Sequence, residues 1–139
     1  MMSHWILVVM LGLDAHFAAS YLVPLDAKAR GEFGGLLRWF WPWAYGDSGV
    51  LGSITLASGF PIVGFFLAAV TFVAFLVGAL AAAGIWVPSG WWRPLSTMGA
   101  VLLLCLMVLF FGPTKLMPML FAIGTLYFAI ARPAAFAVG

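Results

Sequence analysis

The charged positions of this 139-residue chain are spaced by lengths that match a membrane crossing. After Ser48 only Arg93, Lys115 and Arg132 carry charge, and the runs between them are largely apolar. A helix needs about 20 apolar residues to cross a bilayer, and ionisable side chains are costly in hydrocarbon. The pattern therefore predicts an all-α integral membrane protein, with a single transmembrane helical domain over residues 1–139.

Four apolar runs predict four transmembrane helices. Prolines lie at or next to several of the ends of these runs. We expect the spans at about 4–23, 61–86, 94–111 and 115–131. Pro24 follows the first run, and Gly112-Pro113-Thr114 forms a turn between the last two. The second span would be about 39 Å long, which exceeds the hydrocarbon core, so we expect it to tilt or protrude.

Most of the polar residues gather between the first two spans. Residues 25–47 hold six of the ten charged side chains. The apolar residues of this segment share one helix face: Phe33, Leu36, Leu37 and Phe40. This spacing predicts a short amphipathic helix over about 32–41, lying at the membrane surface. The alternative is a loop packed on the helix ends, because Gly34 and Gly35 disfavour a helix.

Aromatic and basic side chains flank the apolar runs, where tryptophan and arginine prefer the membrane–water interface. We predict the following interface anchors: Trp5, Trp39, Trp41, Trp43, Trp86, Trp91, Trp92 and Arg93. In a four-span chain the first and third loops together hold four basic residues, and the other side holds two. The positive-inside rule then favours outside N and C termini in a prokaryotic plasma (inner) membrane.

Small residues recur along the second span, mostly at four-residue spacing. They are Gly64, Ala68, Ala74, Gly78 and Ala82. Such spacing lets helix backbones approach closely in lipid, so we expect these positions to face another helix of this chain or of a partner. The alternative is an ordinary lipid-facing run of alanine and glycine. Replacing Gly78 with leucine distinguishes the two, because only the packed arrangement would be weakened.

Asp14 is the one acidic residue inside a predicted span. An intramembrane carboxyl group suggests a proton or cation site. The alternative is a neutral, hydrogen-bonded side chain that holds helices together, which burial favours. Ala18 and Tyr21 lie on the same helix face, so Tyr21, or a serine or threonine of a neighbouring helix, is the expected partner.

His16 lies two positions after Asp14 and therefore points away from it, which excludes an Asp–His catalytic dyad within this helix. A single histidine could ligate the magnesium of a chlorophyll from one side. A packed, hydrogen-bonded histidine is the alternative that we favour. Two histidines and Cys105, without a paired-ligand motif, do not form an ordinary zinc site.

Composition narrows the function. Charged residues make up 7% of the chain, against about 25% in soluble domains, and the net charge of +2 is too small and scattered for a nucleic-acid partner. No nucleotide-binding or nucleophile motif is present, so we do not expect an enzyme. We expect an accessory or assembly subunit of a larger membrane complex, such as a bioenergetic one.

Its partners would be other integral membrane subunits and membrane lipids. No cofactor is required, although thirteen Phe and seven Met residues offer surface for lipid, carotenoid, quinone or chlorophyll. The alternative function is a small proton- or ion-coupled transporter that acts as an oligomer through Asp14.

Overall fold

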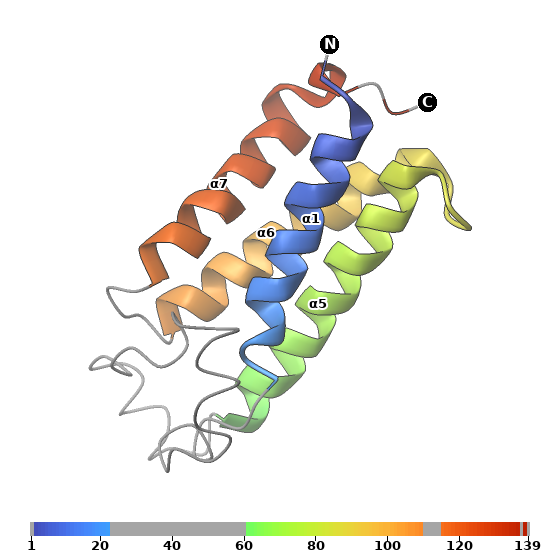
Figure 1. The fold of residues 1–139 in the computed structure, drawn as a ribbon. Helices are drawn as coiled ribbons and strands as arrows, with labels where there is room; N and C mark the ends of the chain where they lie inside the picture. Colours follow the sequence, from blue (N-terminus) through green and yellow to red (C-terminus); the bar gives the residue numbers. More distant parts are fainter. Residues whose placement is uncertain (1, 23–60, 110–114, 137, 139) are drawn as a thin grey trace, which may run out of the picture.

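The computed structural model describes residues 2–22, 61–109, 115–136 and 138, which form four α-helices and no strand (Figure 1). The helices are α1 (His4–Ala19), α5 (Pro61–Ala83), α6 (Trp92–Leu109) and α7 (Leu116–Ala131). Two short 3-10 turns, η2 (Ser89–Trp91) and η4 (Pro133–Ala135), accompany them. The all-helical prediction is confirmed for these residues. The surface helix predicted over 32–41 and the anchors Trp39, Trp41 and Trp43 lie outside the described residues.

Two of the four helical segments are long and apolar enough to cross a membrane, Ile62–Ala83 and Ser89–Leu109. The other two, α1 and α7, are apolar but have only 16 residues each. At 1.5 Å per residue they are about 24 Å long, whereas the 23 residues of α5 reach about 34 Å. The structure thus provides two full-length candidate spans, and two helices that fall short of the typical hydrocarbon thickness.

The end of α5 lies three residues before the predicted end at Trp86, and glycine explains the difference. Gly84 has φ +71°, a left-handed conformation that is strained for other residues. Its N–H donates to Ala81 O over 3.1 Å, and the Ile85 N–H donates to Leu80 O over 2.9 Å. These two bonds form a Schellman motif, which satisfies carbonyls of the last turn and ends the helix.

The start of α6 also differs from the prediction. The helix begins at Trp92 rather than at Pro94, so Pro94 occupies its first turn. Proline is tolerated there because the first N–H groups of a helix have no partner within the helix. The η2 turn, from Ser89 to Trp91, leads directly into it.

The helices follow one another up and down the bundle. The main contacts join α1 to α5, α5 to α6 and α6 to α7, and a lighter contact between α1 and α7 closes the arrangement. The two ends of the chain lie at the same end of the bundle (Figure 1). There the Met2 N–H donates to Ala135 O over 2.7 Å, and Met2 and Phe136 form an isolated parallel bridge.

The small residues of α5 lie inside the bundle. Gly64, Ala68, Ala74, Gly78 and Ala82 are all buried. A Cβ at Gly78 would lie 3.5 Å from the Leu95 Cβ and 3.6 Å from the Ser96 Oγ of α6, and 3.8 Å from the Leu11 Cδ1 of α1. Three helices therefore meet at Gly78, which is close packing within this chain.

One predicted interface anchor is wrong. Trp92 is only 4% exposed, and its ring packs edge-on against Phe136 with 6.3 Å between the centroids. Adjacent helical residues point in different directions, so Trp91 can be exposed while Trp92 enters the core. Trp5, Trp86 and Trp91 are exposed, as is Arg93.

Candidate functional site

Asp14 lies in the buried stripe of α1. Leu7, Leu11 and Ala18 share this stripe at helical spacing, and all of them are buried. The side chain of Asp14 is fully buried, with 0% exposed area. It lies ten residues after His4, or about 15 Å along the helix. The sequence therefore places a carboxyl group in the middle of the bundle, among apolar neighbours.

The partner of Asp14 comes from the last helix. Thr125 occupies the buried stripe of α7 together with Pro118, Ala122 and Ala129. Its hydroxyl Oγ1 donates to Asp14 Oδ2 over 2.5 Å, and both residues are buried. This bond joins positions 111 residues apart and ties α1 to α7, where the helix contact is otherwise light.

Asp14 Oδ1 and the Ser96 hydroxyl oxygen of α6 are buried polar atoms without a hydrogen-bond partner within the described part of the chain, and both residues are 0% exposed. Other buried hydroxyls bond to their own helices: Thr71 to Leu67 O over 2.6 Å and Ser20 to Phe17 O over 2.7 Å. An unsatisfied buried polar atom costs free energy, so Asp14 and Ser96 are positions of the described interior that a structural role alone does not account for.

Tyr21 belongs to a different part of the bundle. It packs with Ala68 and Leu106 in a separate buried cluster. The Lys115 ammonium lies 5.4 Å from the centroid of its ring, a cation–π distance. Of the two kinds of partner expected for Asp14, the structure therefore places a threonine of a neighbouring helix beside the carboxyl group. Shared helix face alone did not bring Tyr21 to it.

His16 is half-buried on α1 beside Phe17, with 6.4 Å between the ring centroids. No group of three or more His, Cys, Asp or Glu side chains that could hold a metal occurs among the described residues. One histidine is enough to ligate a pigment, so this role for His16 stays a prediction.

Sequence reasoning did not single out Thr125 or Ser96. A signal was present, because Thr125 is the only serine or threonine in α7 and lies between the small residues Ala122 and Ala129. Comparisons with protein-family models, with curated proteins and with solved structures give no match. The function is therefore argued from the residues of this chain.

Proposed function

We propose that the chain is a multi-pass integral membrane protein in which all four helices cross the bilayer. The support is the distribution of polarity. Large apolar side chains are exposed on every helix, for example Val9, Phe66, Val108 and Leu120. Polar side chains such as Asp14 and Thr125 lie inside. In each of the two long helical segments only 39% of the apolar stretch is buried, whereas the core helix of a soluble protein would be mostly buried.

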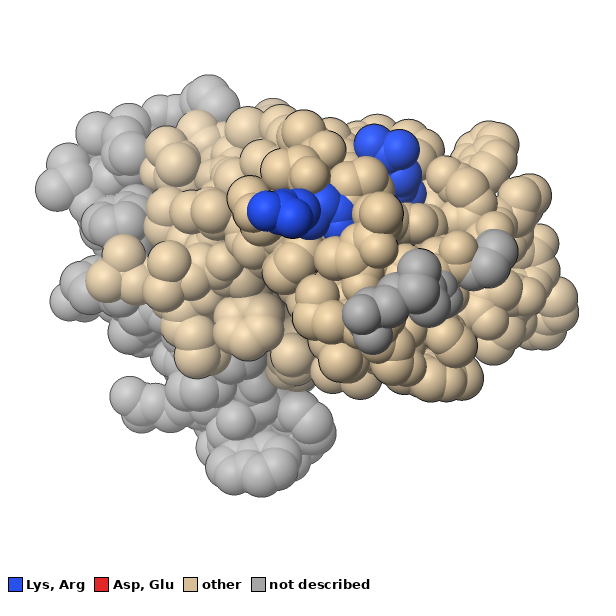
Figure 2. Space-filling model, turned by 90° about the horizontal axis from the view of Figure 1, so that it is seen from above, with Lys and Arg blue, Asp and Glu red and all other residues tan. Residues whose placement is uncertain are grey.

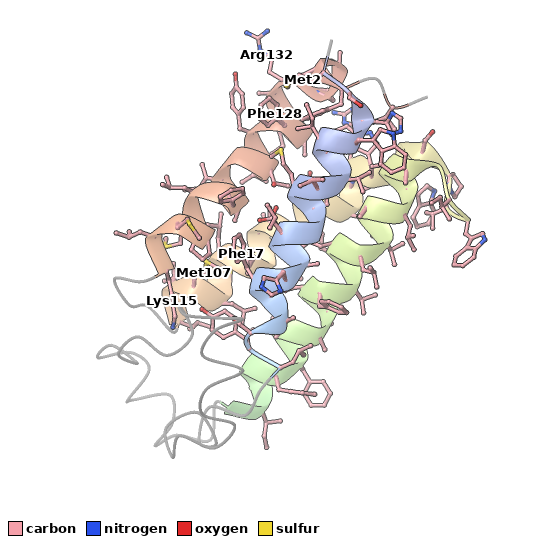
Figure 3. All side chains as sticks on the ribbon, in the orientation of Figure 1. Met2, Phe17, Met107, Lys115, Phe128 and Arg132 are labelled. Atoms are coloured by element: carbon pink, nitrogen blue, oxygen red, sulfur yellow. The ribbon has the colours of Figure 1, made fainter. Side chains whose placement is uncertain are left out.

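The ends of the bundle support the same proposal. Lys115 and Arg132 lie at opposite ends (Figure 3). Exposed Trp5 and Trp91 lie near the helix ends at which the termini meet, as interfacial aromatics do. The short helices α1 and α7 can cross if the bilayer thins locally and flanking side chains such as Arg132 reach to the interface.

We further propose that the protein is a non-catalytic accessory or assembly subunit of a larger membrane complex. The observation that carries this proposal is an outward stripe on α5. Its members recur at helical spacing and are 50–67% exposed: Ile62, Phe66, Val70 and Val73. An apolar stripe of this kind can pack against helices of other integral membrane subunits. The buried carboxyl group is already engaged in joining α1 to α7 through Thr125.

Purification of the tagged full chain in mild detergent tests the subunit proposal. We expect a fixed stoichiometric set of other membrane proteins. Val70→Trp should reduce their recovery, because it enlarges the α5 stripe. Val108→Trp is the matched control, since Val108 is equally exposed but lies on α6. Recovery of a homo-oligomer alone, unchanged by either variant, contradicts the proposal.

A second candidate function is proton- or ion-coupled transport by an oligomer. It is favoured by one observation, the Oδ1 atom of Asp14, which has no partner among the described residues at mid-depth in the bundle. Proton flux into vesicles that contain the purified protein tests it. We expect no flux that depends on Asp14. A clear wild-type signal that Asp14→Asn abolishes, and that Thr125→Ser retains, would replace the subunit proposal with this one.

Orientation follows from the same proposal. Arg93 and Arg132 flank the end where the termini lie, and the larger number of basic residues falls in the segments that connect the opposite helix ends. The termini then lie outside. A cysteine at the exposed Gly90, in a Cys105→Ala background, should react with an impermeant maleimide from outside intact cells. Labelling only after the membrane is opened reverses the orientation.

A further inference from the structure

A groove with a volume of about 700 Å³ runs between α6 and α7. It is mostly apolar, and its lining includes Val101 of α6 together with Ala129 and Ile130 of α7. The lining residues with polar side chains are Arg93 and Thr97. Arg93 is the second residue of α6. Val101 lies eight residues further on, about 12 Å along the helix axis. The groove thus has a cationic side chain at the end where α6 begins, and it is apolar along the rest of its length. We call the end at Arg93 the outer end of the groove.

One hydrogen bond positions the Arg93 side chain at this outer end of the groove. Its Nε–H donates to Ala129 O over 3.3 Å. Ala129 belongs to the last turn of α7, whose carbonyls have no partners within the helix, so the arginine also caps α7. This bond uses one of the five N–H donors of a guanidinium group, and the side chain is exposed. The remaining donors can form two parallel bonds to a phosphate.

The surroundings of Arg93 carry no compensating negative charge among the described residues. Asp14 is the only acidic residue described, and it is buried and bonded to Thr125. Figure 2, which views the molecule from above, shows basic side chains on this face and no acidic ones. Arg132, which is exposed, extends from the same end in Figure 3. Such a surface attracts anions.

We propose that this groove binds one anionic phospholipid, with its phosphate on Arg93 and an acyl chain along α6 towards Val101. The proposal rests on the proposed membrane insertion, which brings lipid to this surface. The order of features favours a phospholipid over a free anion. Arg93, which can bind a phosphate, lies at one end of the groove, and the apolar lining follows it, in the same order as the headgroup and acyl chain of a lipid. Exposed Trp91, two residues before Arg93 in the chain, is a residue type that prefers the membrane interface.

Native mass spectrometry of the detergent-purified full chain tests the headgroup contact. The probes are phosphatidylglycerol and phosphatidylcholine of the same acyl length, titrated separately. We expect one phosphatidylglycerol to bind with a clear preference. Arg93→Gln should weaken this binding about tenfold, because the bidentate phosphate contact is lost. It should also abolish the preference, because it removes the positive charge that favours a lipid of net negative charge over zwitterionic phosphatidylcholine. Arg132→Gln is the control and should retain it. Equal loss in both variants indicates diffuse surface attraction and overturns the proposal.

A second pair of variants tests the apolar trough. Val101→Trp fills the groove and should reduce phosphatidylglycerol binding, whereas Val9→Trp, on the exposed face of α1, should not. Unchanged binding in Val101→Trp overturns the proposal, as does equal protection from thermal unfolding by inorganic phosphate and by phosphatidylglycerol. Carbonate extraction of wild-type membranes is scored separately. Release of the protein by carbonate refutes membrane insertion itself, whereas retention without lipid preference refutes only the groove.

Discussion

The ring of Phe75 covers Gly99, where a Cβ would lie 3.0 Å from the Cε1 atom of that ring. Phe75 belongs to α5 and is fully buried, and Gly99 belongs to α6. The absence of a side chain at Gly99 is what lets the ring lie between the two helices. This contact and the one at Gly78 bring α6 close to α5 through glycines on opposite sides of the interface.

The two glycines should respond differently to alanine. In Gly99→Ala the new methyl group crowds a ring that is enclosed on all sides, so we expect a loss of about 1–3 kcal/mol in the free energy of unfolding. In Gly78→Ala the nearest atoms lie at ordinary contact distances, and helix propensity favours alanine by about 1 kcal/mol. Unfolding by a denaturing detergent measures both. Equal effects contradict this account of the packing.

A larger side chain at Gly78 should be destabilising even though alanine is tolerated. Leucine would extend into Leu11 and Leu95, which come from two different helices. We expect Gly78→Leu to cost about 1–3 kcal/mol. Leucine at the half-buried position Gly124, whose Cβ direction is open, is a matched control in the same assay. Unchanged stability of Gly78→Leu would mean that the helices can separate without loss.

The hydrogen bond between Thr125 and Asp14 should stabilise the fold, so removal of either its donor or its acceptor should be destabilising. Thr125→Val removes the only donor described for Asp14 and should cost about 1–3 kcal/mol. Thr125→Ser keeps the hydroxyl and should cost less. Asp14→Asn keeps an acceptor and should be tolerated. A double-mutant cycle between Asp14→Ala, which removes the acceptor, and Thr125→Val measures the coupling, expected near about 1 kcal/mol. A coupling of zero refutes the contact.

The two ends of the α5–α6 connection contrast a buried and an exposed tryptophan. Trp92→Ala removes a side chain that packs against Phe136, so we expect a loss of about 3 kcal/mol or more in unfolding free energy. Trp86 is 93% exposed, and Trp86→Ala should leave detergent stability within about 0.5 kcal/mol. If the membrane proposal holds, Trp86→Ala instead weakens anchoring in vesicles. Comparison of the two variants in detergent and in vesicles separates core packing from interfacial contact.

Cys105 gives a direct test of membrane insertion. It is the only cysteine in the chain, and its side chain is exposed on α6, thirteen residues after the helix begins. In a spanning helix this thiol faces hydrocarbon, where a charged maleimide cannot reach it. We expect labelling in intact vesicles to be at least about tenfold slower than in denaturing detergent. Rapid labelling in vesicles would mean that this face of α6 contacts water.

The sequence predicted the helices well because apolar runs, prolines and glycines act locally. Pro61 is the first residue of α5, and Gly84, with its left-handed backbone, follows the last residue. The predicted end of the second span was three residues too late. Gly84, Ile85 and Trp86 are small or apolar, so hydrophobicity alone does not distinguish them from the helix before them. The left-handed backbone at Gly84, rather than any loss of hydrophobicity, ends the helix there.

The site was predicted only in part, because a helical wheel shows which face a residue occupies but not which helix faces it. Periodicity placed Asp14 and Tyr21 on one face of the first predicted span, yet α1 ends at Ala19. Asp14 meets Thr125 of α7, whereas Tyr21 packs with Leu106 of α6. The same limit applies to Trp91 and Trp92, which are identical in type and adjacent. Only packing decides which of the two is exposed.

The bond between Met2 and Ala135 has a consequence for the order of the helices. It brings the two ends of the described chain together, so the helices form a closed ring in which each contacts the next. In such a ring the contacts between helices should be the same whichever connection between two helices is cut to give the chain termini. A circular permutant with a short linker between these ends, and new termini near Gly90, should assemble the same four helices in the order α6, α7, α1, α5.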